Sequence, residues 1–353
     1  MKKNNPFSGL DNTAVYGLLF PALFFLFLGH GIAGEKPEGD PSILSPGAEL
    51  ELLFSDTFFA EGPAVARDGS VYFSDITFTF KSNMQAGRIW NYNPNTGITK
   101  VFRSPSGMSN GIKFDAQGRM IVAEGADYGG RRVTRTDLTT GKTEIIAGLY
   151  KGRPFNSPND IAIDEKERIY FSDPRYVGHE PIEQPIMGVY RVDPDGTIEL
   201  IVTDAGRPNG IAISPDQKSL YVVSNDDGSL GFDRLPEGTV FHKGRMALLA
   251  YDLSKAGTAS FREVLVDYSP QDGPDGLTVD VEGNLYVAVR DLTRYGIYVY
   301  TPAGVELAYI PTPKVPTNVG FGRGMESNTL YITAETDLLR IKVKKKGYQL
   351  PPR

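Results

Sequence analysis

The stretch PNGIAISPDQKSLYVVS (208–224) defines the architecture of the chain, because its pattern recurs along the sequence. It opens with a polar residue and a glycine, Asn209 and Gly210, and continues as two short runs separated by a turn. Apolar and polar side chains alternate in these runs, and such alternation between Gly, Pro and Asp residues indicates a β-hairpin. Five further copies follow the pattern: EGPAVARDGSVYFSD (61–75), SNGIKFDAQGRMIVAE (109–124), PNDIAIDEKERIYFSD (158–173), PDGLTVDVEGNLYVAV (274–289) and TNVGFGRGMESNTLYIT (317–333).

We call the polar residue that opens each copy the marker residue. The six marker residues, at steps of 49, 49, 50, 66 and 43 residues, are Glu61, Asn110, Asn159, Asn209, Asp275 and Asn318. A second hairpin with a Gly-containing turn falls between consecutive copies, at 89–102, 133–147, 189–202, 248–266 and 297–311. Two hairpins per repeat provide the four strands of a propeller blade. We therefore predict an all-β, six-bladed β-propeller with four-stranded blades.

The last repeat lacks one strand, since only LLRIKV (338–343) follows its first hairpin. The missing strand is found near the other end of the chain, where ELELLFSD (49–56) resembles IELIVTDA (198–205) of the third repeat. We expect this N-terminal strand to complete the sixth blade and close the ring, which leaves no free sheet edge.

The N-terminal 33 residues have the features of an export signal. Lys2 and Lys3 precede an apolar run (14–29), and Gly31 and Ala33 supply small residues at positions −3 and −1 of a cleavage site. The alternative is an uncleaved membrane anchor, although the run is shorter than the roughly 20 residues that span a bilayer. We predict a signal peptide (1–33), a linker (34–47), the propeller (48–344) and a C-terminal tail (345–353), with export to the periplasm or the extracellular space.

Composition excludes several functions. The chain has no Cys, which rules out thiol catalysis, thiolate zinc sites and iron–sulfur clusters, and an exported form must be stable through its core alone. Without residues 1–33 the net charge is −7, which argues against nucleic acid as a partner. Membrane contact is expected only through the signal segment.

The six marker residues are all oxygen donors, and each stands just before the expected innermost strand of its blade. A single Asn-Gly is most often only a turn. Six such positions in register would bring their side chains to one mouth of the central channel. Hard cations such as Ca²⁺ bind six to eight oxygens from carboxylates, amides and water, so the pattern predicts one divalent cation. Asn110 and Asn318 are the least specific members of the set, and either line the channel or only turn the chain.

Zinc is a weaker fit by this reasoning. Beyond the signal segment the chain has two His residues, His179 and His242, and they do not have metal-ligand spacing. The same shortage argues against a Ser-His-Asp triad.

Four short motifs, EGP (61–63), SPND (157–160), PNG (208–210) and PDGL (274–277), each lie in their own repeat. With them the chain resembles, over roughly residues 45–343, the senescence marker protein (regucalcin) and gluconolactonase family. The resemblance implies a six-bladed propeller with one divalent cation, usually Ca²⁺, at the channel mouth. It also implies hydrolysis of lactones or, in a few members, of phosphorus–fluorine bonds.

Position by position, the resemblance implies that Glu61, Asn209 and Asp275 bind the metal, with Asp275 as the catalytic carboxylate. Asn159 matches a residue that binds metal or substrate. The chain has Ser157 where the animal lactonases carry an Arg, and Val177 or its neighbours where they carry a substrate-binding Glu. Polyol recognition in that style is therefore not expected. Further candidates for substrate binding, some of them from a possible lid (172–185), are Asn110, Asn159, Ser157, Arg175, Tyr176 and His179, and Asn318 is the candidate for lining the channel.

The leading hypothesis is an exported lactonase that depends on a divalent cation, with Ca²⁺ favoured over Mg²⁺, Mn²⁺ or Zn²⁺. The cation would polarise the lactone carbonyl, and Asp275 would accept a proton from the attacking water. Two alternatives stay open at this point: a non-catalytic, metal-stabilised propeller that binds a protein or glycan, and a phosphoester or organophosphate hydrolase at the same site.

Overall fold

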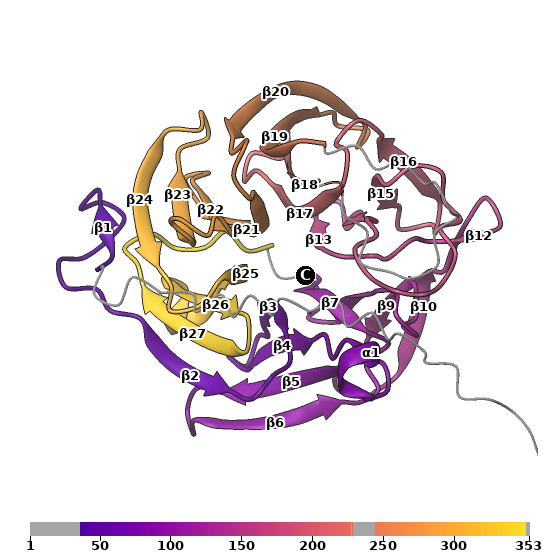
Figure 1. Cartoon of the computed structure of the whole chain (residues 1–353), viewed down its shortest axis with the longest axis horizontal. Coiled ribbons are helices and arrows are strands. Elements are labelled where there is room, and N and C mark those ends of the chain that lie inside the picture. The colour runs from indigo at the N-terminus through magenta and orange to yellow at the C-terminus, as the bar shows by residue number, and fades with distance from the viewer. Residues whose placement is uncertain (1–35, 227, 229–243, 351–353) are drawn as a thin grey trace, which may run out of the picture. The chain divides into compact units, whose positions relative to one another are not determined.

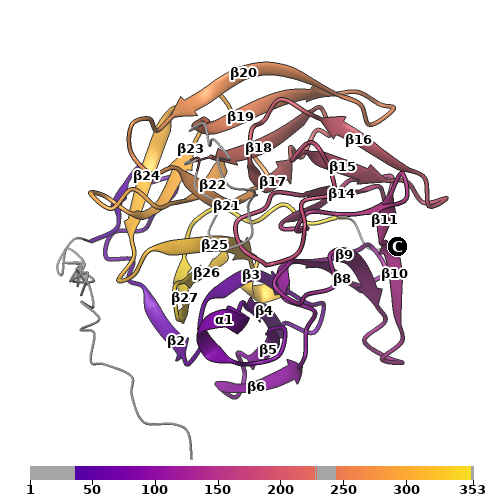
Figure 2. The same ribbon diagram turned by 45° about the vertical axis from the view of Figure 1, so that its right-hand side comes forward.

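The six-bladed β-propeller is confirmed by the computed structural model, which describes residues 36–226, 228 and 244–350. Six antiparallel sheets stand around a central channel, and Figure 1 shows this ring face-on. Figure 2, turned by 45°, shows the blades stacked side by side around it. In every blade the strand that comes first in the repeat is the innermost.

The strands of the first three blades are as follows. Blade 1 contains β3 (Ala60–Val65), β4 (Val71–Asp75), β5 (Arg88–Asn93) and β6 (Ile98–Arg103). Blade 2 contains β7 (Ser109–Phe114), β8 (Met120–Glu124), β9 (Arg132–Thr136) and β10 (Thr143–Ala147). Blade 3 contains β13 (Ile161–Ile163), β14 (Ile169–Ser172), β15 (Val189–Val192) and β16 (Ile198–Val202).

The other three blades complete the ring. Blade 4 contains β17 (Pro208–Ile213), β18 (Ser219–Asn225), β19 (Met246–Leu253) and β20 (Ala259–Asp267). Blade 5 contains β21 (Pro274–Val279), β22 (Leu285–Val289), β23 (Gly296–Tyr300) and β24 (Glu306–Pro311). Blade 6 contains β25 (Pro316–Phe321), β26 (Thr329–Ala334), β27 (Asp337–Lys342) and β2 (Glu51–Ser55).

Ring closure follows the prediction from the sequence. The N-terminal strand β2 pairs antiparallel with β27, so the outer strand of blade 6 comes from the opposite end of the chain. Short elements in the connections are a hairpin of β11 (Leu149–Tyr150) and β12 (Arg153–Pro154), one turn of helix α1 (Thr79–Ser82) and a 3₁₀ turn (Gly324–Glu326). Within the described residues no helix is long and apolar enough to cross a membrane.

The core consists of six apolar clusters, one between each pair of neighbouring blades. Successive side chains of a strand point to opposite faces of the sheet. On β8, Met120 and Val122 accordingly pack toward blade 1, whereas Ile121 and Ala123 pack toward blade 3. Both faces of each blade are packed against neighbouring blades, so apolar side chains point to both sides of strands such as β8 and β22.

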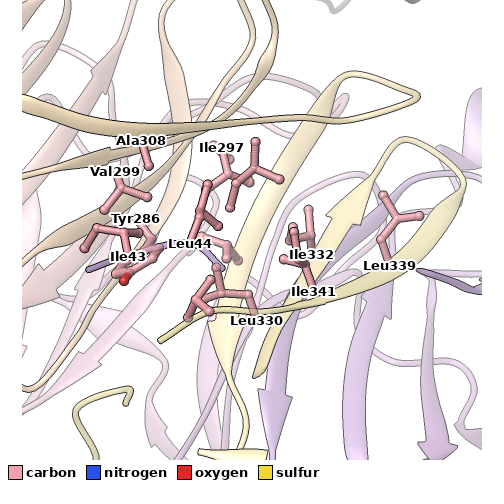
Figure 3. Close-up of a cluster of buried hydrophobic side chains, with 14 of the residues drawn as sticks. Ile43, Leu44, Tyr286, Ile297, Val299, Ala308, Leu330, Ile332, Leu339 and Ile341 are labelled. Atoms are coloured by element: carbon pink, nitrogen blue, oxygen red, sulfur yellow. The ribbon is translucent and has the colours of Figure 1, made fainter. Parts of the chain in front are cut away.

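The described part of the expected linker packs onto the propeller. β1 (Glu38–Gly39) adds a fifth strand to the edge of blade 5 by pairing with β24. Ile43 and Leu44 are buried, and Figure 3 shows them inside the cluster between blades 5 and 6, beside Tyr286 and Leu330. This segment therefore contributes to the core rather than serving only as a tether.

The C-terminal segment covers the channel mouth opposite the marker residues. Tyr348, Gln349 and Leu350 line a cavity with the distal ends of all six innermost strands. The Tyr348 N–H donates to the carbonyl of Val279, and its hydroxyl donates to Glu165 (2.9 Å). Access to the channel from this side is consequently narrowed.

A pair of Leu→Ala substitutions tests the packing of the N-terminal segment. Leu44 is buried between blades 5 and 6, whereas Leu52 on β2 is 58% exposed. We expect Leu44→Ala to lower the free energy of unfolding by about 2–4 kcal/mol, since it leaves a cavity, and Leu52→Ala to change it by less than about 0.5 kcal/mol. Urea unfolding measures both. Equal effects would show that the segment before β2 does not pack as described.

Candidate active site

The marker residues sit where the innermost strands depart from regular pairing. In five blades the register shifts at the marker, as between Glu61 and Ala64 in blade 1 or between Pro274 and Leu277 in blade 5. A β-bulge inserts an extra residue and re-aims the side chains around it. The bulges therefore turn the marker side chains toward the channel axis instead of toward a neighbouring blade.

The glycine after a marker residue is required by close approach of the innermost strands. A Cβ on Gly111 would lie 2.6 Å from the carbonyl oxygen of Asn159, and one on Gly210 would lie 2.5 Å from that of Asp275. Gly62 meets the backbone of Asn110 in the same way. Each glycine thus abuts the marker of the next blade, so the Asn-Gly and Asp-Gly pairs do more than turn the chain.

Seven of the predicted site residues line one cavity of about 310 Å³ at this mouth of the channel. They come from five different blades and from the β14–β15 connection: Glu61, Asn110, Ser157, Asn159, Tyr176, Asn209 and Asp275. Segments separated by more than 200 residues in the sequence therefore meet in one concave site. Its volume lies within the range typical of small-molecule pockets.

Four buried oxygen atoms in this cavity accept no hydrogen bond from the described part of the chain. They are the Oδ1 atoms of Asn110, Asn159, Asn209 and Asp275, whose residues are 5–7% exposed. A buried polar atom without a partner costs about 1–3 kcal/mol, so four together need an explanation. A hard cation is an efficient one, because amide and carboxylate oxygens are the ligands that Ca²⁺ and Mg²⁺ prefer. The residues present therefore fit a divalent cation.

Glu61 supplies the second carboxylate of the site. The Oε2 of Glu61 accepts hydrogen bonds from the backbone N–H of Gly62 (3.0 Å) and from the side-chain amide of Asn318 (3.2 Å). Asn318, 2% exposed, lies behind Glu61 and does not line the cavity as the structure describes it. The structure thus places this marker where it orients a carboxylate rather than where it meets a ligand.

Asp275 is held by an ion pair that the sequence did not predict. Arg290 Nη1 donates to its Oδ2 at 3.0 Å, while Oδ1 has no hydrogen-bond partner among the described residues. Burial raises the pKa of Asp275 to about 6, and Arg290 acts against this rise. Burial also raises the pKa of Glu61 well above its usual range, and the charge of Asp275 adds to this effect. A bound cation would favour the ionised form of both.

Arg290 does not occupy a repeat position that the sequence singles out. The polar residue at the end of the second strand secures the backbone near a marker in blades 1 and 3. Asp75 accepts hydrogen bonds from the N–H groups of Phe58 and Phe59, and Asp173 accepts from those of Asn156 and Ser157. In blade 5 the equivalent residue is Val289, which pairs with Pro274 as Asp75 pairs with Ala60 in blade 1, and Arg290 follows it by one residue.

Asp160 is a second residue near the site that the repeat pattern did not predict. It occupies the position that is glycine in four other copies, and it is 1% exposed. Its Oδ1 accepts from the N–H of Ile161 (2.8 Å) and its Oδ2 from that of Ile211 (3.3 Å). Burial raises the pKa of Asp160, and the charge of Lys113 opposes the rise. A third carboxylate therefore stands near the two of the site and adds to the negative potential there.

The candidates around the expected lid divide into two groups. Ser157 and Tyr176 line the cavity: the Ser157 hydroxyl accepts from the Ala126 N–H (3.0 Å), and the Tyr176 hydroxyl donates to the carbonyl of Asn225 (3.1 Å). Arg175 and His179 do not line it. Arg175 is fully buried and donates to Glu180 (3.2 Å), and the ring of His179 lies 3.8 Å from that of Tyr128. The latter two stabilise the connection that carries Tyr176.

The candidate metal donors of the site are oxygen atoms. Within the described residues no three side chains of the His, Cys, Asp and Glu types gather at metal-binding distance. Besides Glu61 and Asp275, the candidate donors are the amide oxygens of Asn residues. Softer metals such as zinc prefer nitrogen and sulfur ligands, so the donor set favours a hard cation.

Comparison with known proteins agrees with this geometry. The model of the family described as the SMP-30/Gluconolactonase/LRE-like region matches residues 59–336. A gluconolactonase from Zymomonas mobilis is 31% identical over 326 residues, which cover 87% of this chain and 84% of that protein. A lactonohydrolase from Aspergillus oryzae is 27% identical, covering 87% of this chain and 73% of its own.

Solved structures give the same result. A gluconolactonase structure from Xanthomonas campestris superposes with a TM-score of 0.72 at 26% identity, covering 88% of this chain and 95% of that one. Regucalcin from Agrobacterium tumefaciens, at 18% identity and a TM-score of 0.65, covers 87% of this chain and 97% of its own, and shows the shared fold. The chain therefore belongs to the SMP-30/gluconolactonase/LRE-like family.

Proposed function

We propose that this protein is an exported lactonase that requires one divalent cation, with Ca²⁺ as the preferred ion. The proposal rests on four side-chain oxygens without a hydrogen-bond partner among the described residues. They belong to Asn110, Asn159, Asn209 and Asp275 and face one cavity beside Glu61. The lactone-hydrolysing relatives support the reaction class over a purely binding role. Membership of the family supports a divalent cation, and the all-oxygen donor set favours Ca²⁺.

Glu61, Asn159, Asn209 and Asp275 would hold the cation, each from its own blade, and the partnerless oxygen of Asn110 faces the same cavity. When bound, the cation supplies Lewis-acid polarisation of the lactone carbonyl and stabilises the negative charge that develops on its oxygen. Because the ligands come from separate blades of a rigid ring, little reorganisation is needed on binding.

Asp275 is suited to act as the general base. It accepts a proton from the water that attacks the carbonyl carbon. The ring C–O bond then breaks, and the proton goes to the leaving ring oxygen, which gives the open hydroxy acid. Arg290 fixes one carboxylate oxygen and leaves the other directed into the cavity. Burial raises the pKa of Asp275, which makes the carboxylate a stronger base, and a bound cation would keep it ionised at neutral pH.

Asn110, Ser157 and Tyr176 are placed to orient the substrate. All three line the cavity and contribute polar atoms at its wall. The Tyr176 ring is itself fixed, because the Arg207 guanidinium lies 5.0 Å from its centroid and its hydroxyl is hydrogen-bonded to Asn225. A rigid polar wall of this kind positions the ester group relative to Asp275.

Substitution of the two carboxylates tests the reaction. We expect purified protein lacking residues 1–33 to hydrolyse lactones with Ca²⁺ and to lose turnover with EDTA. Asp275→Asn and Glu61→Gln should each lower kcat/KM at least about 100-fold, while the exposed Asp252→Asn should leave it within about twofold. Turnover is measured on sugar and aliphatic lactones with Ca²⁺, Mg²⁺, Mn²⁺ and Zn²⁺. Undiminished turnover in Asp275→Asn would contradict the role of this carboxylate.

Export is proposed from residues 1–33, which lie outside the described part of the chain. The basic start, the apolar run and the small residues before position 34 support a cleaved signal. We expect the full-length protein, expressed in a Gram-negative host, to appear in the periplasm or medium with an N-terminus near Gly34. Intact-mass analysis of the fractions measures this. A cytoplasmic protein that retains residues 1–33 would refute export, and a membrane-bound one would favour an anchor.

A further inference from the structure

The cavity wall has two chemically different parts. The polar part comprises all marker residues except Asn318, together with Ser157, Tyr176, Asn225, Asp272 and Arg290. The apolar part, which we call the apolar wall, comes from the connections of blades 1 to 3 and consists of Phe59, Ile76, Phe78, Met108, Ala126 and Val177. The marker positions do not account for this second part.

The side chains of the apolar wall are packed against one another and held in place. The rings of Phe59 and Phe78 meet edge-on with centroids 5.4 Å apart. Phe78 (φ 43°) and Met108 (φ 55°) adopt left-handed backbone conformations, which are costly for large side chains. Such a conformation persists only where the surrounding structure enforces it, and it often does so at a ligand site.

Hydrogen bonds join the three connections that carry the wall. The Thr79 N–H, next to Phe78, donates to Asp127 Oδ2 (2.7 Å). The N–H groups of Asp127 and Tyr128 donate to the two carboxylate oxygens of Glu180 (3.1 and 2.7 Å), and the buried Arg175 also binds Glu180. Blades 1, 2 and 3 are thereby linked, so the wall is formed before any substrate arrives.

A fully hydroxylated substrate is poorly matched to this wall. A sugar lactone carries a hydroxyl group on most ring and side-chain carbons, and each one buried without a partner costs about 1–3 kcal/mol. The six side chains of the wall offer no hydroxyl, amide or charged group. Ser157, which also lines the cavity, accepts from the Ala126 N–H and so offers a single hydroxyl donor, fewer groups than a sugar lactone needs.

We infer that the preferred substrate is a lactone with an alkyl or aryl substituent, whose hydrocarbon part lies on Phe59, Phe78 and Met108 while its ester faces the marker oxygens. This inference rests on the proposed lactonase function. Binding of the hydrocarbon substituent would aim the carbonyl carbon at Asp275, because the apolar and polar parts of the wall are fixed relative to each other.

A homologous series measures the contribution of the wall. The substrates are γ-butyrolactone, γ-lactones with one to five side-chain carbons, and D-glucono-1,5-lactone. We expect kcat/KM to rise about fourfold for each CH₂ that becomes buried, with the glucono-lactone below the longer alkyl lactones. Preference for the glucono-lactone, with no gain along the alkyl series, would overturn the inference and leave the lactonase function intact.

Two phenylalanines in sequence provide a matched pair of variants. Phe59 lines the cavity, whereas the adjacent Phe58 is 45% exposed and does not line it. Phe59→Ala should lower kcat/KM about tenfold for the longest lactone and less than twofold for γ-butyrolactone, and Phe58→Ala should change neither. A uniform loss along the series, or an equal effect of both variants, would contradict the role of the wall.

Binding of ketones that cannot be hydrolysed separates this inference from the proposed function. Calorimetry with cyclopentanone and 2-pentylcyclopentanone should show at least tenfold tighter binding of the alkylated ketone, and Phe59→Ala should remove the difference. If no lactone is hydrolysed but this difference is seen, the lactonase function fails and the wall stands as a hydrocarbon-binding surface. Equal affinities for the two ketones would show that the apolar wall does not bind a hydrocarbon substituent.

Discussion

The structure depends on buried side-chain oxygens at the channel mouth that need a partner. Four side-chain oxygens accept no hydrogen bond from the described residues, and two carboxylates with raised pKa values stand among them. Left alone, this arrangement costs several kcal/mol of folding stability. We propose that a ligand compensates this cost. A doubly charged cation would do so by replacing the missing donors and by favouring the ionised carboxylates.

The propeller makes this arrangement possible because the packing of all six blades holds the innermost strands in place. Each blade buries both faces against its neighbours, so six apolar clusters hold the innermost strands in place. The strands approach so closely that no Cβ fits after most of the markers. Pairing of β2 with β27 closes the ring, and the buried Leu44 adds to the last interface. Packing of the blades thus fixes the backbone at the mouth, and Arg290 and Asn318 orient the two carboxylates.

The repeat pattern was sufficient to predict the fold, because each repeat is one unit of alternating strands and the same units recur six times. It also brought Glu61, Asn209 and Asp275 to one mouth of the channel, since marker position and strand order fix the direction of a side chain. β1 was not predicted because a strand of two residues has no readable period, and its pairing depends on the exposed edge of β24. Arg290 was missed because it lies one residue beyond the repeat position, which is Val289 in blade 5, and its contact with Asp275 is seen only in the folded structure. The lid candidates show a further limit: Arg175 turns inward to Glu180, whereas Tyr176 faces the cavity, and no periodicity separates neighbours in an irregular connection.

Calorimetric titration of the chelated protein with Ca²⁺ tests the central claim most directly. The account predicts one cation per chain at pH 7.5. It predicts weaker affinity at pH 5, since Asp275, with a pKa near 6, must lose its proton to bind. It further predicts at least about tenfold weaker binding in Asn159→Leu and in Asn209→Leu, each of which removes one partnerless oxygen, and unchanged binding in the exposed control Asn95→Leu. Undiminished binding in both site variants, or no saturable binding by the wild-type protein, would contradict the claim that these oxygens form a cation site.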